Sequence, residues 1–249
     1  EVWSVRSGDL LDADGHFGRL ERSLAELRIT NPKSRVGYRL VIAELLRRNR
    51  VRDGLVYLQI SRGRARRDHA FPAADTRPTV VMTAKRLDPA AADRRADHGV
   101  AVITRPDERW ARCDIKTVNL LPNVLAKQAA LEAGAAEAWL VDGAGKVTEG
   151  SSTNAWILNA DGVLVTRQAD HAILHGITRA TIMNRAAALG YRVEERSFSV
   201  EEAQSAREAF MTSATTFVTS ITSIDGRPVG NGAPGSVAIA LRAAYLESL

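Results

Sequence analysis

The N-terminal part of the chain alternates between strand-like and helix-like hydrophobic patterns. Residues 1–11 predict two strands joined at Ser7-Gly8-Asp9, since glycine and small polar residues between apolar runs are typical of hairpin turns. Apolar residues recur at helical spacing over 16–27, after Asp14, and predict a helix. A second helix is predicted over 34–49. Its apolar positions are Val36, Leu40, Val41, Leu45 and Leu46.

In the middle of the chain, the strand-like hydrophobic pattern is interrupted by a polar stretch. Runs of β-branched residues at 55–63 and 79–85 predict two neighbouring strands. Residues 86–97 (RLDPAAADRRAD) lose this periodicity and carry proline, alanine and charge, so we expect a linker between two domains there. Strands are predicted again at 100–105 and at 111–117 (ARCDIKT).

The C-terminal part combines helices with antiparallel hairpins. Helices are predicted over 119–133 and 177–189, each followed by a glycine that suits a helix C-terminus. Apolar runs separated by glycine-rich turns predict hairpins over 137–166, and strands and helices continue to alternate as far as Leu249. The pattern therefore predicts an α+β protein of two domains, roughly 1–88 and 95–249.

The composition excludes several classes of protein. The 249 residues are 45% hydrophobic and 25% charged, as in ordinary globular proteins. The net charge of +5 is spread along the chain and is weak support for nucleic-acid binding. No apolar run approaches the roughly 18–20 residues of a membrane span, and no signal peptide is visible. With Cys113 as the single cysteine, we expect a cytoplasmic protein without a disulfide or a metal site.

Lys116 is one of five lysines, against 29 arginines, among the 34 basic residues. It lies in RCDIKTVNLL, an apolar setting at a predicted junction of strand and helix. Partial withdrawal from water disfavours the charged form of a lysine and leaves more neutral amine to act as a nucleophile. An exposed lysine at the end of a strand is the alternative interpretation.

Three turns are further candidates. In VTEGSSTN, the Glu149 carboxylate could pair with a ring nitrogen, or the segment could be a solvated hairpin turn. In LHGITR, Gly176 leads directly into a helix whose free N–H groups and Thr178 hydroxyl could bind a phosphate, or Thr178 could merely cap that helix. The SATT sequence at 213–216 is a second hydroxyl cluster, after an apolar strand, and by itself is equally ambiguous.

A basic run at 61–72 (SRGRARRDHAFP) is the last candidate. It could be a nucleic-acid or localisation patch, although aromatic residues make up only 5% of the chain. Arg67 and His69 would share one face of an extended segment and could bind a carboxylate. A solvated loop is the alternative.

In their order and spacing, these motifs resemble the class IV (fold type IV) pyridoxal-phosphate aminotransferases, and among these the D-amino acid aminotransferases. The resemblance extends from Glu1 to about Gly226. It is most specific in RCDIKTVNLLPNVLAKQAALEAGAAEAWL, VTEGSSTNAWIL, ILHGITR and RGRARRDHAFP. It implies a two-domain α+β fold, each domain having a sheet or barrel core with flanking helices. It also implies pyridoxal 5'-phosphate (PLP) as cofactor and transamination between an amino acid and a 2-oxo acid.

The resemblance implies a role for each matching residue. Lys116 matches the lysine that binds the cofactor covalently and moves the substrate α-proton. Glu149 matches the carboxylate that keeps the pyridine nitrogen protonated, which makes the ring an electron sink. The other matched cofactor contacts are Arg19, Gly176, Ile177 and Thr178 at the phosphate and Leu174 at the ring.

Arg67 and His69 match the R-x-H pair that binds the substrate α-carboxylate in D-amino acid aminotransferases, where the pair reaches in from the neighbouring subunit. The resemblance therefore implies a homodimer, with substrates such as D-alanine, D-glutamate, pyruvate and 2-oxoglutarate. Branched-chain aminotransferases, aminodeoxychorismate lyase and R-selective amine transaminases share the lysine, glutamate and phosphate loop and remain alternatives. A basic, non-catalytic binding protein is a distant one.

The sequence departs from the family pattern in three places. Glu1 matches the last glutamate of an F-x-D-G-x-x-E element, so about thirty family residues, including a substrate-contacting tyrosine, have no counterpart here. The family's second phosphate hydroxyl falls on Ala214, which leaves Ser213 or Thr215 to replace it. SATTFVTSITS lacks the usual glutamate and proline, so the substrate side-chain pocket is undefined.

Overall fold

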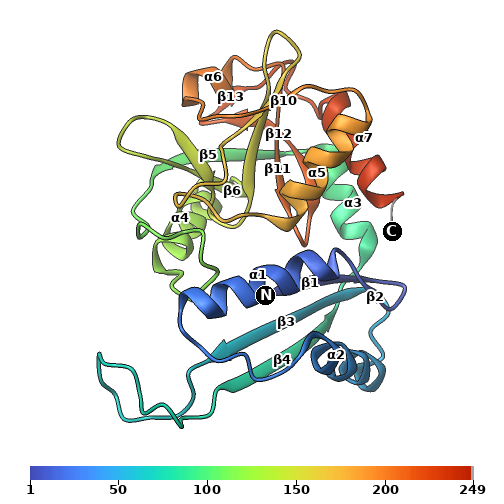
Figure 1. Cartoon of the computed structure of the whole chain (residues 1–249). Coiled ribbons are helices and arrows are strands. Elements are labelled where there is room, and N and C mark those ends of the chain that lie inside the picture. Colours follow the sequence, from blue (N-terminus) through green and yellow to red (C-terminus); the bar gives the residue numbers. More distant parts are fainter. Residues whose placement is uncertain (248–249) are drawn as a thin grey trace. The chain divides into compact units, whose positions relative to one another are not determined.

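The computed structural model describes residues 1–247 and divides into two compact units. Unit 1 is Glu1–Pro89, and unit 2 begins at Ala90. Each unit combines a β-sheet with flanking helices, so the predicted α+β class is confirmed (Figure 1). The last two residues of the predicted second domain, 248–249, lie outside the described residues.

Unit 1 is a four-stranded antiparallel sheet, ordered β2-β1-β3-β4, that shares one core with two helices. Its elements are β1 (Val2–Arg6), β2 (Asp9–Leu10), α1 (Ala13–Glu26), α2 (Arg35–Asn49), β3 (Gly54–Ser61) and β4 (Thr79–Arg86). The predicted hairpin at the start is confirmed. Ser7 and Gly8 form its turn with φ values of 52° and 97°, a conformation that suits the tight connection of two twisted strands.

The second helix buries only some of its apolar positions. Tyr38, Ile42 and Leu46, spaced four residues apart, enter the core of unit 1. Val36 and Leu40, two of the apolar positions that predicted this helix, are 66% and 68% exposed. The amphipathic pattern of this segment is therefore ambiguous, because it carries apolar residues on two faces and only packing against the sheet selects one.

Unit 2 is built on a nine-stranded mixed sheet ordered β10-β9-β8-β11-β12-β5-β6-β7, with β13 beside β12. Its elements are α3 (Pro89–His98), β5 (Val100–Pro106), α4 (Leu121–Glu132), β6 (Glu137–Val141), β7 (Val147–Gly150), β8 (Asn154–Leu158), β9 (Leu164–Thr166), α5 (Ile177–Ala188), β10 (Val193–Glu195), α6 (Val200–Gln204), β11 (Glu208–Ser213), β12 (Phe217–Ile224), β13 (Arg227–Pro228) and α7 (Ser236–Leu246). The predicted hairpins over 137–166 are confirmed as the antiparallel pairs β6–β7 and β8–β9.

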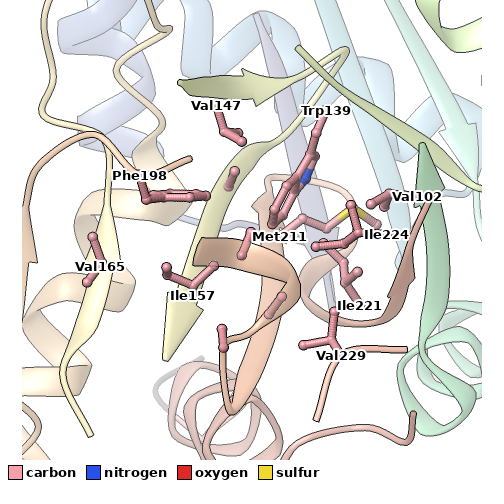
Figure 2. Close-up of a cluster of buried hydrophobic side chains, with 14 of the residues drawn as sticks. Val102, Trp139, Val147, Ile157, Val165, Phe198, Met211, Ile221, Ile224 and Val229 are labelled. Atoms are coloured by element: carbon pink, nitrogen blue, oxygen red, sulfur yellow. The ribbon is translucent and has the colours of Figure 1, made fainter. Parts of the chain in front are cut away.

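The sheet of unit 2 curls, so that β7 at its end comes back against β8. The Gly150 N–H donates to the Thr153 carbonyl over 2.7 Å where β7 turns into β8. The curl encloses a dry core (Figure 2). In it, the Trp139 and Phe198 rings meet edge to face with centroids 5.9 Å apart, and Met211 and Ile221 lie beside them. This packing holds the ends of β7 and β8, which carry the polar side chains of Glu149 and Asn154, in fixed positions.

Two segments differ from their expected local structure. Residues 86–97, expected to link two domains, contain the boundary between the two units, after Pro89. They also contain helix α3, because Pro89 suits a first helical position and alanine is a strong helix former. Residues 111–117, expected to be a strand, form a turn in which the Ile115 N–H donates to the Arg112 carbonyl over 3.2 Å. Arg112 also binds the buried Asp114 carboxylate in two places, which orders the side chains of this turn.

Candidate active site

Glu149 stands at the end of β7 and is only 5% exposed. Its Oε1 accepts hydrogen bonds from Arg109 Nη1 and, over 3.0 Å, from the Leu174 N–H. Its Oε2 accepts one from Asn154 Nδ2 over 2.8 Å. Burial raises the pKa of the Glu149 carboxyl to about 7, in spite of the opposing effects of the Arg109 charge and these hydrogen bonds. Burial disfavours the ionised form of Glu149, so a further positively charged partner would stabilise that form.

Arg109 is the main residue of this site that the sequence reasoning missed. Its buried guanidinium donates to Asp107 as well as to Glu149, and Nη2 also reaches the Ala172 carbonyl over 2.9 Å. One guanidinium is thus shared by two carboxylates. A single sequence offers little signal for it, because an arginine in a polar segment such as RPDERW is typical of an exposed position.

Lys116 lies in the irregular segment between β5 and α4 and is half-buried. Three residues earlier, the Cys113 N–H donates to the His171 carbonyl over 2.9 Å. Arg109, in the same segment, joins Glu149 to Ala172. The segment that carries Lys116 is therefore tied to Glu149 and to the turn that precedes α5. Burial and nearby carboxylates raise the pKa of the Cys113 thiol to about 11, so it stays protonated at neutral pH.

The start of α5 fits an anion. Gly176 is the N-cap and no side chain caps the helix, so its first N–H groups and its dipole face outward from Ile177. Thr178 is 2% exposed, and its Oγ1 is buried with no hydrogen-bond partner. Because an unpaired buried hydroxyl costs free energy, this arrangement suits a bound phosphate that accepts from it. Leu174, on the preceding turn, is half-buried and holds Glu149 through its backbone N–H.

The second hydroxyl cluster forms the turn between β11 and β12. Ser213 Oγ lies 2.8 Å from Thr216 Oγ1 and 3.4 Å from Thr215 Oγ1, and Ala214 carries no hydroxyl. Arg242 of α7 supports the turn by donating to the Thr216 carbonyl over 2.7 Å. Ser213 is thus engaged within its own turn, and both it and Thr215 remain predictions as phosphate ligands.

Arg19, Arg67 and His69 belong to unit 1. Arg19 is buried on α1, where Nε and Nη2 bind the two carboxylate oxygens of Glu1 at 2.9 and 2.8 Å. His16 Nδ1 is 2.8 Å from the same carboxylate. Arg67 and His69 are exposed on the long loop that connects β3 and β4 (Figure 1).

Two kinds of site are not found in the part of the chain that the structure describes. No cluster of three or more histidine, cysteine, aspartate or glutamate side chains there could hold a metal ion. No helix among residues 1–247 is long and apolar enough to cross a membrane.

Comparisons with known proteins identify the family. A family model described as amino-transferase class IV matches residues 1–224. D-alanine aminotransferases of Bacillus licheniformis and Listeria innocua are each 38% identical to this chain, covering all of it and 86% of their own length. The structure of a branched-chain amino acid aminotransferase of T.th. with pyridoxamine 5'-phosphate superimposes with a TM-score of 0.89 at 29% identity, over 100% of this chain and 83% of that one. The chain belongs to the class IV aminotransferases, PLP-dependent transferases that move an amino group between an amino acid and a 2-oxo acid.

Proposed function

We propose that this transferase acts on D-amino acids of the D-alanine and D-glutamate class, with pyruvate and 2-oxoglutarate as amino acceptors. The observation that carries the proposal is the pair Arg67 and His69 on an exposed loop, in a chain 38% identical to D-alanine aminotransferases. An arginine and a histidine two residues apart on an extended loop suit the two oxygens of a substrate α-carboxylate. Branched-chain aminotransferase activity is the alternative on the same fold.

Within this proposal, each site residue has a defined role. PLP supplies an electron sink for the substrate α-carbon. Lys116 holds the cofactor and carries the proton to and from the α-carbon. Glu149 accepts a hydrogen bond from the protonated ring nitrogen, the positive partner that its raised pKa favours. Phosphate binding falls to Thr178 Oγ1 and the N–H groups at Ile177, with Ser213 or Thr215 as a further donor. For Arg19, whose Nε and Nη2 bind Glu1, a phosphate role rests on the family resemblance alone.

Absorbance titration of the holoenzyme with D-alanine and with L-alanine tests the substrate. We expect D-alanine to convert the cofactor spectrum and L-alanine to leave it unchanged. Lys116→Ala should abolish both the spectrum of covalently bound cofactor and turnover, and Lys127→Ala is the matched control. Activity on L-leucine with none on D-alanine would instead establish the branched-chain alternative.

The carboxylate pair has its own test. We expect Arg67→Ala to raise KM for D-alanine by roughly 10- to 100-fold, the effect of losing a hydrogen bond to a charged group. Arg66→Ala, in the same exposed loop, is the matched control and should change KM little. Equal effects of the two variants would contradict a specific role for Arg67.

A homodimer and a cytoplasmic location complete the proposal. Five apolar side chains at and before the start of α4 are 47–68% exposed, which favours burial against another subunit. They are Val118, Leu120, Leu121, Val124 and Leu125. The lone cysteine, Cys113, suits a reducing compartment.

Mixing two inactive variants tests whether Arg67 and His69 act across subunits. One variant carries Lys116→Ala and the other carries Arg67→Ala with His69→Ala. If the pair serves the partner's site, each mixed dimer regains one intact site, and random exchange restores about a quarter of the activity. If the pair serves its own subunit, mixing restores none.

A further inference from the structure

Asn154 connects two parts of the candidate site, Glu149 and the turn at Leu174, that the sequence separates by 25 residues. It is buried at the first position of β8, where its backbone is paired with Thr212 of β11. Its Nδ2 donates to Glu149 Oε2 over 2.8 Å and to the Leu174 carbonyl over 3.0 Å. The Leu174 N–H in turn donates to Glu149 Oε1 over 3.0 Å. Asn154, Glu149 and the turn before α5 therefore form a closed ring of hydrogen bonds.

Gly176 gives independent support for the importance of the Asn154 side chain. Its φ and ψ of −63° and 130° are open to any residue, so the backbone conformation does not require glycine. A Cβ at this position would instead lie 1.9 Å from Asn154 Oδ1 and 3.2 Å from Arg179 Cβ. Glycine stands at the N-cap of α5 because the Asn154 amide occupies the space of a side chain.

We propose that Asn154 is a positioning residue that couples the ring-nitrogen carboxylate, Glu149, to the phosphate-binding turn at Leu174–Thr178. This inference rests on the proposed roles of Glu149 and Thr178. The Asn154 amide orients Glu149 Oε2 toward the ring nitrogen. Through the Leu174 carbonyl, it also fixes the position of the turn that presents the N-terminus of α5 to the phosphate. Asn154, on strand β8, thereby positions the protein groups at both ends of the cofactor, the ring nitrogen and the phosphate.

The isosteric substitution Asn154→Asp tests the coupling, because it keeps the shape and removes both donors. A second carboxylate beside Glu149 makes the two groups share a proton, so we expect the acidic limb of the kcat–pH profile to move to higher pH. The Leu174 carbonyl also loses its donor. We therefore expect the Kd for PLP to rise by about 10- to 100-fold.

Comparing PLP with pyridoxal, which lacks the phosphate, isolates the effect on the turn. Titration of the apo-protein, followed by tryptophan fluorescence, gives both Kd values without any turnover. If Asn154 holds the phosphate turn, the preference for PLP over pyridoxal falls in Asn154→Asp. A purely structural asparagine would lower the melting temperature of the apo-protein and leave both this preference and the pH profile unchanged, and that result would overturn the proposal.

Two asparagines of the same unit provide matched controls. Asn159 Oδ1 accepts from the Val163 N–H over 2.9 Å, a bond that aspartate retains, so Asn159→Asp should behave like wild type. Asn123 Nδ2 donates to the Ser151 carbonyl over 2.8 Å. Asn123→Asp therefore removes an amide donor near the site without touching Glu149, and should lower the melting temperature without moving the pH profile.

Gly176→Ala perturbs the contact between residue 176 and the Asn154 amide, and it provides a second test if Asn154→Asp does not fold. The added methyl group must displace the Asn154 amide, so we expect it to shift the kcat–pH profile although residue 176 does not contact Glu149. In an Asn154→Ala background this shift should largely vanish, since the two changes act through one contact. Additive effects would overturn the proposal. Failure of the wild-type enzyme to respond to D-alanine would instead contradict only the proposed substrate.

Discussion

Two buried carboxylates, one in each unit, both lie against an arginine and yet differ in their ionisation. Glu1 binds Nε and Nη2 of Arg19 and also His16. Burial works to raise the pKa of Glu1, but the Arg19 charge and the hydrogen bonds hold that pKa well below its usual value. For Glu149, burial prevails and raises the pKa to about 7.

The difference lies in how each arginine is shared. Among the described contacts, Arg19 gives two donors to the single carboxylate of Glu1, whereas Arg109 divides its donors between Asp107 and Glu149. Glu1 is therefore neutralised by its own unit, while Glu149 has only part of a counter-charge. An incompletely compensated carboxylate is suited to a positive ligand atom, and a fully compensated one is suited to holding the fold.

The largest expected effect is on the stability of unit 1. Glu1→Gln removes the carboxylate that binds the buried Arg19 guanidinium and should lower the free energy of unfolding by about 3–5 kcal/mol. Urea denaturation measures it. Glu21→Gln is the control, since Glu21 pairs with Arg35 at the surface and should cost less than about 1 kcal/mol. Equal losses would show that burial does not distinguish these pairs.

Glu149→Gln should affect the reaction more than the fold. It removes the negative partner of the ring nitrogen, so we expect kcat with D-alanine to fall about 10²- to 10³-fold. Glu137 is a matched buried carboxylate of unit 2, and it binds Ser151 and Ser152 instead of the site. Glu137→Gln should lower stability while kcat per folded molecule stays near wild type. A kcat of Glu149→Gln within about threefold of wild type would contradict the assignment.

The two carboxylates should also give opposite dependences of apo-protein stability on pH. The pKa of Glu149 is raised from 4.5 to about 7, so the folded apo-protein binds more protons than the unfolded chain between these values. Stability from this group is therefore lost as pH rises through that window, by about 3 kcal/mol in total. Glu1, whose pKa is lowered, contributes stability that is lost as pH falls below about 4.5. Urea midpoints across pH, compared with those of Glu149→Gln and Glu1→Gln, check both signs.

Asp107→Asn is expected to give the smallest effect. It tests whether the sharing of Arg109 causes the difference in pKa between Glu149 and Glu1. It removes a competing carboxylate from Arg109, so the pKa of Glu149 should fall from about 7 toward its ordinary value. The pH-dependent loss of apo-protein stability would then move to lower pH. An unchanged midpoint would mean that the sharing of Arg109 does not set the ionisation of Glu149.

Much of the fold and part of the site follow from local patterns. Turn glycines and alternating apolar residues predicted the hairpins β1–β2, β6–β7 and β8–β9, because such signals depend on neighbours in sequence. Helix α3 was missed because its alanines and charges form no apolar face, and only Ala96 is buried. The strand predicted at 111–117 is a turn instead, closed by the hydrogen bond from the Ile115 N–H to the Arg112 carbonyl.

The sequence by itself determined the chemistry available to this protein: a lysine, a carboxylate before a glycine, and a glycine-threonine helix start, in an order typical of class IV aminotransferases. Only the tertiary structure decided how these groups are tuned. Arg109 and Asn154 reach Glu149 from 40 and 5 residues away, and Leu174 from 25. Such contacts arise when the curled sheet brings strand ends and loops together, and burial there fixes the ionisation of Glu149. No local pattern encodes that burial, because it is created jointly by residues that are distant in the chain.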